Sequence, residues 1–141
     1  MSFKEEYSVA AIVFYGNEYL LLKYGLGHWE FVKGHQDAGE TDAQTIMREL
    51  EEETGITDAI ILSGFKERYE YYFTFKGQKI HKTVSCYLIK SNTKHVEISY
   101  EHEDFIWLPY HKALKRLSFK NARKLIQKAE ISRKSPLNSF L

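Results

Sequence analysis

The chain lacks most of the features that mark a secreted or membrane-embedded protein. It has one cysteine, Cys86, so no disulfide can form within it, and a lone thiol fits a reducing compartment. The longest apolar run, Val9 to Tyr15, has seven residues and is too short to cross a bilayer. Residues 1–7 lack the apolar core of a signal peptide. These absences predict a cytoplasmic protein with no membrane partner.

Internal repeats, low-complexity segments and linkers are missing as well. The 141 residues are 43% hydrophobic and 28% charged, an ordinary balance for a soluble globular protein that is long enough to bury a core. We therefore predict one domain over residues 1–141, in which residues 134–141, including Ser135-Pro136, form a frayed tail. No pattern in the chain specifies an oligomeric state.

The net charge of +1 conceals a basic C-terminal part. Residues 111–134 contain nine Lys or Arg and a single acid, Glu130. Such a segment could bind nucleic acid or a polyanionic substrate. It is equally typical of a solvated amphipathic helix, and the spacing of Leu125, Ile126 and Ala129 favours that interpretation.

Periodicity and turn residues predict a chain in which strands and helices alternate. A hairpin is expected from Tyr7 to Tyr24, because two runs rich in β-forming residues flank the turn dipeptide Gly16-Asn17. A helix is expected within residues 34–56. The remaining expected elements are strands at 29–32, 60–73, 82–90 and 104–109, a turn at 75–78, and helices at 111–117 and 119–133. This order predicts an α/β fold in which helices cover both faces of a sheet, an α/β/α sandwich.

The most informative segment is residues 34–56, GHQDAGETDAQTIMRELEEETGI. On a helical wheel, Glu49, Glu52 and Glu53 lie together beside an apolar face. Neighbouring carboxylates repel one another unless cations lie between them, and such hard oxygen ligands suit Mg²⁺ or Mn²⁺. Taken alone, the acidic run 51–53 is also typical of a solvated helix face.

The ends of this helix can be predicted from local residues. Thr41 and Gln44 have the spacing of a capping box, and Gly55 is a typical glycine stop. Residues 34–39 are expected to form a loop that is flexible at its two glycines. A backbone carbonyl of this loop could reach a metal held by the helix.

Arg48 has several potential partners. It lies too far along the chain from Glu40 for a pair within one helix. If the preceding loop folds back, Arg48 could pair with Glu40, or it could instead orient Glu49 or Glu52.

Nine positions of this segment follow a single pattern: Gly, five residues, Glu, seven residues, Arg-Glu-aliphatic, one residue, Glu-Glu, one residue, Gly-aliphatic. On these residues the chain resembles the Nudix hydrolases. The resemblance implies that the helix packs on a mixed sheet and that the protein hydrolyses a nucleoside diphosphate linked to another moiety. The implied site consists of Glu52 and Glu53 as metal ligands, Glu49 as ligand or general base, the Gly34 carbonyl as ligand, Arg48 as the residue that orients the carboxylates, and Glu40 in support.

Cleavage of a pyrophosphate linkage needs the chemistry of such a site. Mg²⁺, with Mn²⁺ as a possible substitute, neutralises phosphate oxygens and lowers the pKa of a bound water, while a carboxylate accepts the proton. A further acid from outside the segment is expected at the metal. Glu101 and Glu103, in the loop before the strand at 104–109, are the two possibilities.

Other parts of the chain narrow the resemblance to the asymmetric diadenosine tetraphosphate hydrolases within the Nudix superfamily. The similar segments are His28-Trp29, Lys33-Gly34-His35, Gly64-Phe65-Lys66, Lys82-Thr83-Val84, and Glu101-His102 through Trp107-Leu108. This resemblance implies that Glu101 joins the metal site, that His28, Lys33 and Lys82 contact the polyphosphate, and that Tyr71 stacks on an adenine. Strand alternation places Tyr69, Tyr71 and Phe73 on one face, so these rings could also serve only in packing. His35 is expected to be structural.

Several rival functions stay open. The ADP-ribose and NADH pyrophosphatases of the superfamily have proline markers that this chain lacks, since its only prolines are Pro109 and Pro136. An enzyme that removes pyrophosphate from RNA 5′ ends or from damaged nucleoside triphosphates is an alternative, and the basic C-terminal part favours the RNA form. A non-catalytic nucleotide-binding regulatory module is the alternative of another class, although such a module has no need for three clustered glutamates.

Overall fold

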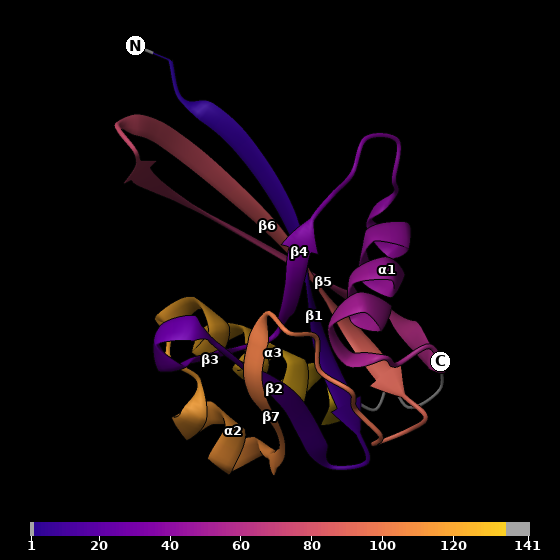
Figure 1. Cartoon of the computed structure of the whole chain (residues 1–141). Helices are drawn as coiled ribbons and strands as arrows, with labels where there is room; N and C mark the ends of the chain where they lie inside the picture. Colours follow the sequence, from indigo (N-terminus) through magenta and orange to yellow (C-terminus); the bar gives the residue numbers. More distant parts are fainter. Residues whose placement is uncertain (1, 135–141) are drawn as a thin grey trace.

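The computed structural model describes residues 2–134, in which a mixed sheet is covered by helices on both faces (Figure 1). The predicted α/β/α sandwich is therefore confirmed. Of the tail predicted at 134–141, Lys134 is the last residue of a helix, and residues 135–141 lie outside the described residues. The elements are β1 (Lys4–Tyr15), β2 (Glu18–Tyr24), the 3₁₀ turn η1 (Gly25–Gly27), β3 (His28–Glu30), β4 (Val32–His35), α1 (Asp42–Thr54), β5 (Ala59–Phe75), β6 (Gln78–Ser91), β7 (His102–Pro109), α2 (Tyr110–Arg116) and α3 (Lys120–Lys134). Within residues 2–134 no helix is both long enough and apolar enough to cross a membrane.

Strand β1 lies at the centre of the sheet. One edge of β1 pairs in parallel with β6, and the other pairs in antiparallel fashion with β4 and with the start of β2. Successive side chains of a strand point to opposite faces, so Ala10 and Ile12 pack towards α2 and α3 while Val9 and Ala11 pack towards α1. The uninterrupted apolar run of β1 follows from burial on both faces.

Helix α1 has the ends that its sequence predicts. The backbone N–H of Gln44 donates to Thr41 Oγ1 at 3.2 Å, and the N–H of Thr41 donates to Gln44 Oε1 at 2.9 Å, which completes the capping box. Gly55 ends the helix in the left-handed region with φ of 74°, and its N–H donates to the carbonyl of Glu51 at 2.8 Å.

The chain between β2 and α1 differs from the prediction. The prediction of a single strand at 29–32 is wrong, because this segment belongs to two strands. β3 pairs with β2, β4 pairs with β1, and the chain passes from one pairing partner to the other at Phe31. Phe31 is buried in the core on the side of α2 and α3. Gly34 is not in a flexible loop as expected but is paired with Val9 inside β4.

Strands β5 and β6 form a long hairpin that, with the start of β1, extends beyond the helices (Figure 1). They are longer than predicted, and the register of β5 shifts between Ile61 and Lys66. Beyond this bulge, Tyr69, Tyr71 and Phe73 share one face, with ring centroids 6.2 Å apart for the first pair and 5.7 Å apart for the second.

Candidate active site

Arg48 of α1 contacts Glu40, in the loop before the helix, and also Glu49 and Glu52 within the helix. Its Nε and Nη2 donate to the two carboxylate oxygens of Glu40 at 2.7 and 3.0 Å. Its Nη1 lies 2.8 Å from Glu49 Oε1 and 3.3 Å from Glu52 Oε2. The preceding loop does fold back, so Arg48 pairs with Glu40 and contacts both other glutamates at once.

Glu40 closes the loop that leads into the helix. Its Oε1 accepts hydrogen bonds from the Asp37 backbone N–H at 2.9 Å and from Thr45 Oγ1 at 3.0 Å. The hydrogen bonds from Arg48, followed by the one from Asp37, lower the pKa of Glu40 to about 2. Glu40 therefore stays ionised near neutral pH and holds Arg48 in place.

Gly34 of β4 and Glu49 of α1 are in close contact. A Cβ built on Gly34 would lie 2.0 Å from Glu49 Cδ and 2.4 Å from its Cγ. The φ of Gly34 is not in the left-handed region, so the backbone does not itself require glycine here. Glycine is needed because the carboxylate of Glu49 lies directly over the strand.

Glu53 is buried beside two polar side chains from other elements. Its Oε1 lies 3.4 Å from the hydroxyl of Tyr24 and 3.1 Å from Nε2 of His102, but the angle at His102 does not suit a hydrogen bond. Its Oε2 has no hydrogen-bond partner. Burial, and next the negative charge of Glu49, raise the pKa of Glu53 to about 8. Burial lowers the pKa of His102, so neutral His102 does not compensate the carboxylate.

The fit of these residues to a divalent cation can be judged from their donor atoms. Among residues 2–134, no three His, Cys, Asp or Glu side chains are already arranged around one point as a metal cage. The reason is that Arg48 holds Glu49 and Glu52, while Glu53 is turned towards His102. Burial also raises the pKa of Glu49, and Glu53 has an unpartnered oxygen. Crowded, partly desolvated carboxylates of this kind fit Mg²⁺ or Mn²⁺.

The two acids outside α1 that were considered as metal ligands, Glu101 and Glu103, have different surroundings in the structure. Glu101 lies in the turn before β7, and its negative charge is among the causes that raise the pKa of Glu53. Glu103 forms a surface ion pair with Lys23 at 3.7 Å. Glu101 is therefore the better placed of the two.

A cavity of about 400 Å³ lies on the other face of the sheet. Its lining consists of Glu30, Lys33, Tyr69, Tyr71, Phe119, Asn121 and Ala122. We call it the aromatic pocket. Tyr71 and Lys33 thus line the same cavity, and Lys33 is paired with Glu30 at 3.7 Å. A pocket of this size with aromatic walls can hold a nucleobase.

The other predicted substrate residues lie near this pocket. His28 packs its ring against Phe119 with centroids 4.9 Å apart. Lys82 is directly opposite Tyr71 in the strand register and therefore shares its face of the sheet. Its ammonium is largely buried, 3.5 Å from Glu6 Oε1 and 3.4 Å from His35 Nδ1. Lys82 thus occupies the same face as the aromatic pocket without lining it.

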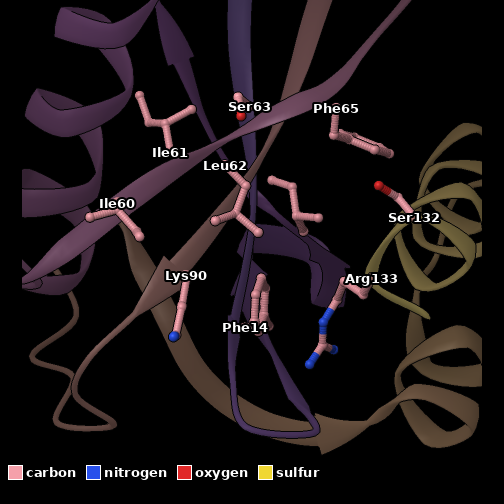
Figure 2. A pocket seen from close by; sticks show the side chains of 10 residues that line it. Phe14, Ile60, Ile61, Leu62, Ser63, Phe65, Lys90, Ser132 and Arg133 are labelled. Carbon is pink, nitrogen blue, oxygen red and sulfur yellow. The ribbon is translucent and has the colours of Figure 1, made fainter. Parts of the chain in front are cut away.

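A second hollow of about 440 Å³ lies elsewhere (Figure 2). It opens where the bulge of β5 faces the end of α3, and Leu62, Phe14 and Arg133 are among its lining residues. Figure 2 shows the Arg133 guanidinium beside the Phe14 ring, and its carbon is 3.8 Å from the ring centroid. None of the predicted site residues lines this hollow, so it is separate from the candidate active site.

Sequence reasoning missed the residues that reach the site from distant segments. Tyr24 lies against Glu53, and Phe119 and Asn121 form the wall of the aromatic pocket opposite β5. Two hydrogen bonds hold that wall: Trp29 N–H donates to Ser118 Oγ at 2.9 Å, and Ser118 N–H donates to the Trp29 carbonyl at 3.2 Å. These contacts span the chain, so no local pattern indicates them.

Comparisons with known proteins identify the family of the chain. A family model described as NUDIX domain matches residues 4–129. The chain is similar to the asymmetrical bis(5'-nucleosyl)-tetraphosphatases of Rattus norvegicus and Mus musculus, at 35% and 37% identity over 116 residues, which are 78% of this chain and 76% of each relative. A crystal structure of a C. elegans Ap4A hydrolase binary complex matches with a TM-score of 0.76 and 28% identity, covering 89% of this chain and 95% of that one.

Proposed function

Because the chain belongs to the Nudix hydrolases, we propose that this pyrophosphohydrolase uses a divalent cation, Mg²⁺ by preference, to hydrolyse diadenosine tetraphosphate to ATP and AMP. The observation that supports the proposal most directly is the packing of Glu49 onto Gly34, with Arg48 holding the same carboxylate at 2.8 Å. A carboxylate held from two sides in this way is suited to act on one defined atom.

The residues of α1 would divide the chemistry among them. Glu49, Glu52 and Glu53, with the Gly34 carbonyl and Glu101, would hold the cation. When bound, the cation supplies charge neutralisation at the phosphates and a water of lowered pKa. Glu49 is the best placed to accept the proton of that water, because burial raises its pKa and Arg48 fixes its orientation.

The opposite face of the sheet would bind the rest of the substrate. Tyr71 and Phe119 provide aromatic faces for one adenine, and Lys33 at the same pocket would contact the polyphosphate. Lys82 and His28 extend this binding region on either side. The similarity to enzymes named for asymmetrical cleavage of a dinucleoside tetraphosphate supports this choice of substrate.

RNA 5′-end hydrolysis is the second candidate function. A shallow hollow of about 300 Å³ on α2 is lined by Lys112, Lys115 and Arg116 together with Leu108. Arg116 lies over the ring of Trp29, 5.2 Å from its centroid, and among residues 2–134 none of the three cations is in an ion pair with an acid, so they could contact an RNA backbone. No comparable surface feature within residues 2–134 favours hydrolysis of damaged nucleoside triphosphates or a non-catalytic binding module. A cytoplasmic location stays a prediction.

The experiment that tests the proposal is a Mg²⁺-dependent hydrolysis panel with the products resolved by anion exchange. Its substrates are diadenosine tetraphosphate, ADP-ribose, 8-oxo-dGTP and a 5′-triphosphorylated RNA. We expect ATP and AMP from the first substrate, at a rate well above the other three. Preference for RNA would establish the second candidate, and no turnover of any substrate would leave the binding module.

The same panel should include two matched variants of α1. Glu52→Gln removes a predicted ligand and should abolish most of the activity while the fold persists. Glu51→Gln, one residue away on the exposed side of the helix, should leave the activity nearly unchanged. Near-normal turnover by Glu52→Gln would show that the metal assignment is wrong.

A further inference from the structure

Asn121 is the lone carboxamide in the aromatic pocket. It is the second residue of α3 and is exposed, and its side chain forms no hydrogen bond with any residue from 2 to 134. We propose that Asn121 recognises the edge of the bound base and makes the enzyme prefer adenine to guanine. The proposal rests on the proposed function, because it assumes that a nucleobase occupies this pocket.

The position of Asn121 follows from how α3 begins. Phe119 precedes the first residue of the helix, and its carbonyl accepts the N–H of Arg123 at 3.1 Å. Because Phe119 lies before the helix, it and Asn121 can both line one cavity, although residues two apart within a helix point in different directions. In this arrangement Phe119 would contact the face of the base, and the exposed Asn121 would contact its polar edge.

The other lining side chains have different roles. Tyr69 and Tyr71 are stacked on one another, with ring centroids 6.2 Å apart, and supply aromatic surface. Glu30 is in an ion pair with Lys33. The hydroxyls of Tyr69 and Tyr71 can each donate or accept through one oxygen. Asn121 differs from them because its carboxamide has the donor and the acceptor on two separate atoms, which can contact two neighbouring atoms of a base at once.

A carboxamide can distinguish the two purines by hydrogen bonding. Adenine presents a donor, its N6 amino group, next to an acceptor, N7, and an asparagine side chain matches both at once. Guanine presents two acceptors, O6 and N7, on the same edge, so the amide oxygen would face an acceptor. Asn121 should therefore favour adenine, while the ring stacking alone is nearly indifferent to the base.

The test compares diadenosine tetraphosphate with diguanosine tetraphosphate as substrates. The wild type should show kcat/KM at least about tenfold higher for the adenine dinucleotide, and Asn121→Ala should lower that ratio about tenfold. The matched control is Gln127→Ala, an exposed amide further along α3, and it should leave the ratio unchanged.

Two outcomes would overturn the proposal: a wild-type ratio near one, or an unchanged ratio in Asn121→Ala. An equal loss of activity on both substrates with a lowered melting temperature would mean that Asn121 only supports the start of α3, which also refutes it. If the wild type hydrolyses neither dinucleotide, the proposed function fails separately. The dissociation constants of AMP and GMP, measured by calorimetry for wild type and Asn121→Ala, then test the base preference by itself.

Discussion

Replacing Gly34 by alanine tests how strictly the carboxylate of Glu49, which we propose to be catalytic, must be positioned. The added Cβ would lie 2.0 Å from Glu49 Cδ and 2.4 Å from both Cγ and Oε1. Ordinary contact begins at 3.4 Å, so the carboxylate must move by about 1.4 Å. The backbone at Gly34 has no positive φ and accepts alanine, so the displacement falls on the side chain of Glu49.

The size of the effect follows from this displacement. Glu49 can move away from β4 only by giving up or distorting its 2.8 Å contact with Arg48. A misplacement of about 1 Å in a catalytic group lowers the rate about 100-fold, so kcat of Gly34→Ala should fall by about that factor or more. The free energy of unfolding should fall by about 1–3 kcal/mol, as for an overpacked contact, so the variant should still fold.

The assay measures kcat under saturating Mg²⁺ and substrate, together with the melting temperature of each variant. Gly25→Ala is the matched control, because its Cβ would meet no atom within 4 Å and its φ is not positive. It should keep wild-type activity. If Gly34→Ala keeps kcat within about threefold of wild type, the close packing of Glu49 on β4 does not matter for catalysis.

Two further predictions concern charge. The pKa of Glu40 is lowered from 4.5 to about 2, so ionised Glu40 stabilises the fold above pH 4.5, and this stabilisation is lost as the pH falls through 2. In Glu40→Gln the melting temperature should therefore depend less on pH in the acid range than in the wild type. The control Glu51→Gln should keep the wild-type pH dependence. The pKa of Glu53 is raised from 4.5 to about 8, so its ionisation destabilises the fold increasingly as the pH rises from 4.5 through 8. Without Mg²⁺ at alkaline pH, Glu53→Gln should melt at or above the wild-type temperature, and it should lose most of the stabilisation that Mg²⁺ gives the wild type. A wild-type response to Mg²⁺ in Glu53→Gln would exclude Glu53 as a ligand.

Local features of the chain could be predicted, and contacts between distant segments could not. The ends of α1 follow from Thr41, Gln44 and Gly55, which act within one helical turn, and the structure has them as expected. The pairing of Arg48 with Glu40 could only be left open, because it depends on the loop between β4 and α1 folding back. The change of pairing partner at Phe31 could not be predicted, because a short apolar run has the same sequence pattern whether the strand continues beside one neighbour or moves to another.

The same limit applies to the environments of individual carboxylates. On the helical wheel, Glu52 and Glu53 are neighbours in one acidic face. In the structure the side chain of Glu52 is 59% exposed, whereas that of Glu53 is 7% exposed against Tyr24 and His102. These two partners come from the end of β2 and the start of β7, which meet only because the sheet pairs those strands. The burial of Glu53 that raises its pKa therefore depends on the pairing of these two strands.

Strand β4 lies between the aromatic pocket and the carboxylates of α1, so its position shows how both could contact one substrate. Lys33 pairs with Ala10, whose side chain faces α2 and α3, and Gly34 pairs with Val9, whose side chain faces α1. Neighbouring residues of one strand thus reach the aromatic pocket on one face and Glu49 on the other. Within residues 2–134, β4 pairs with β1 alone, which leaves its second edge unpaired. A polyphosphate chain crossing that edge would join a base in the pocket to the carboxylates of α1, and an elongated substrate such as a dinucleoside tetraphosphate suits this path better than a compact one.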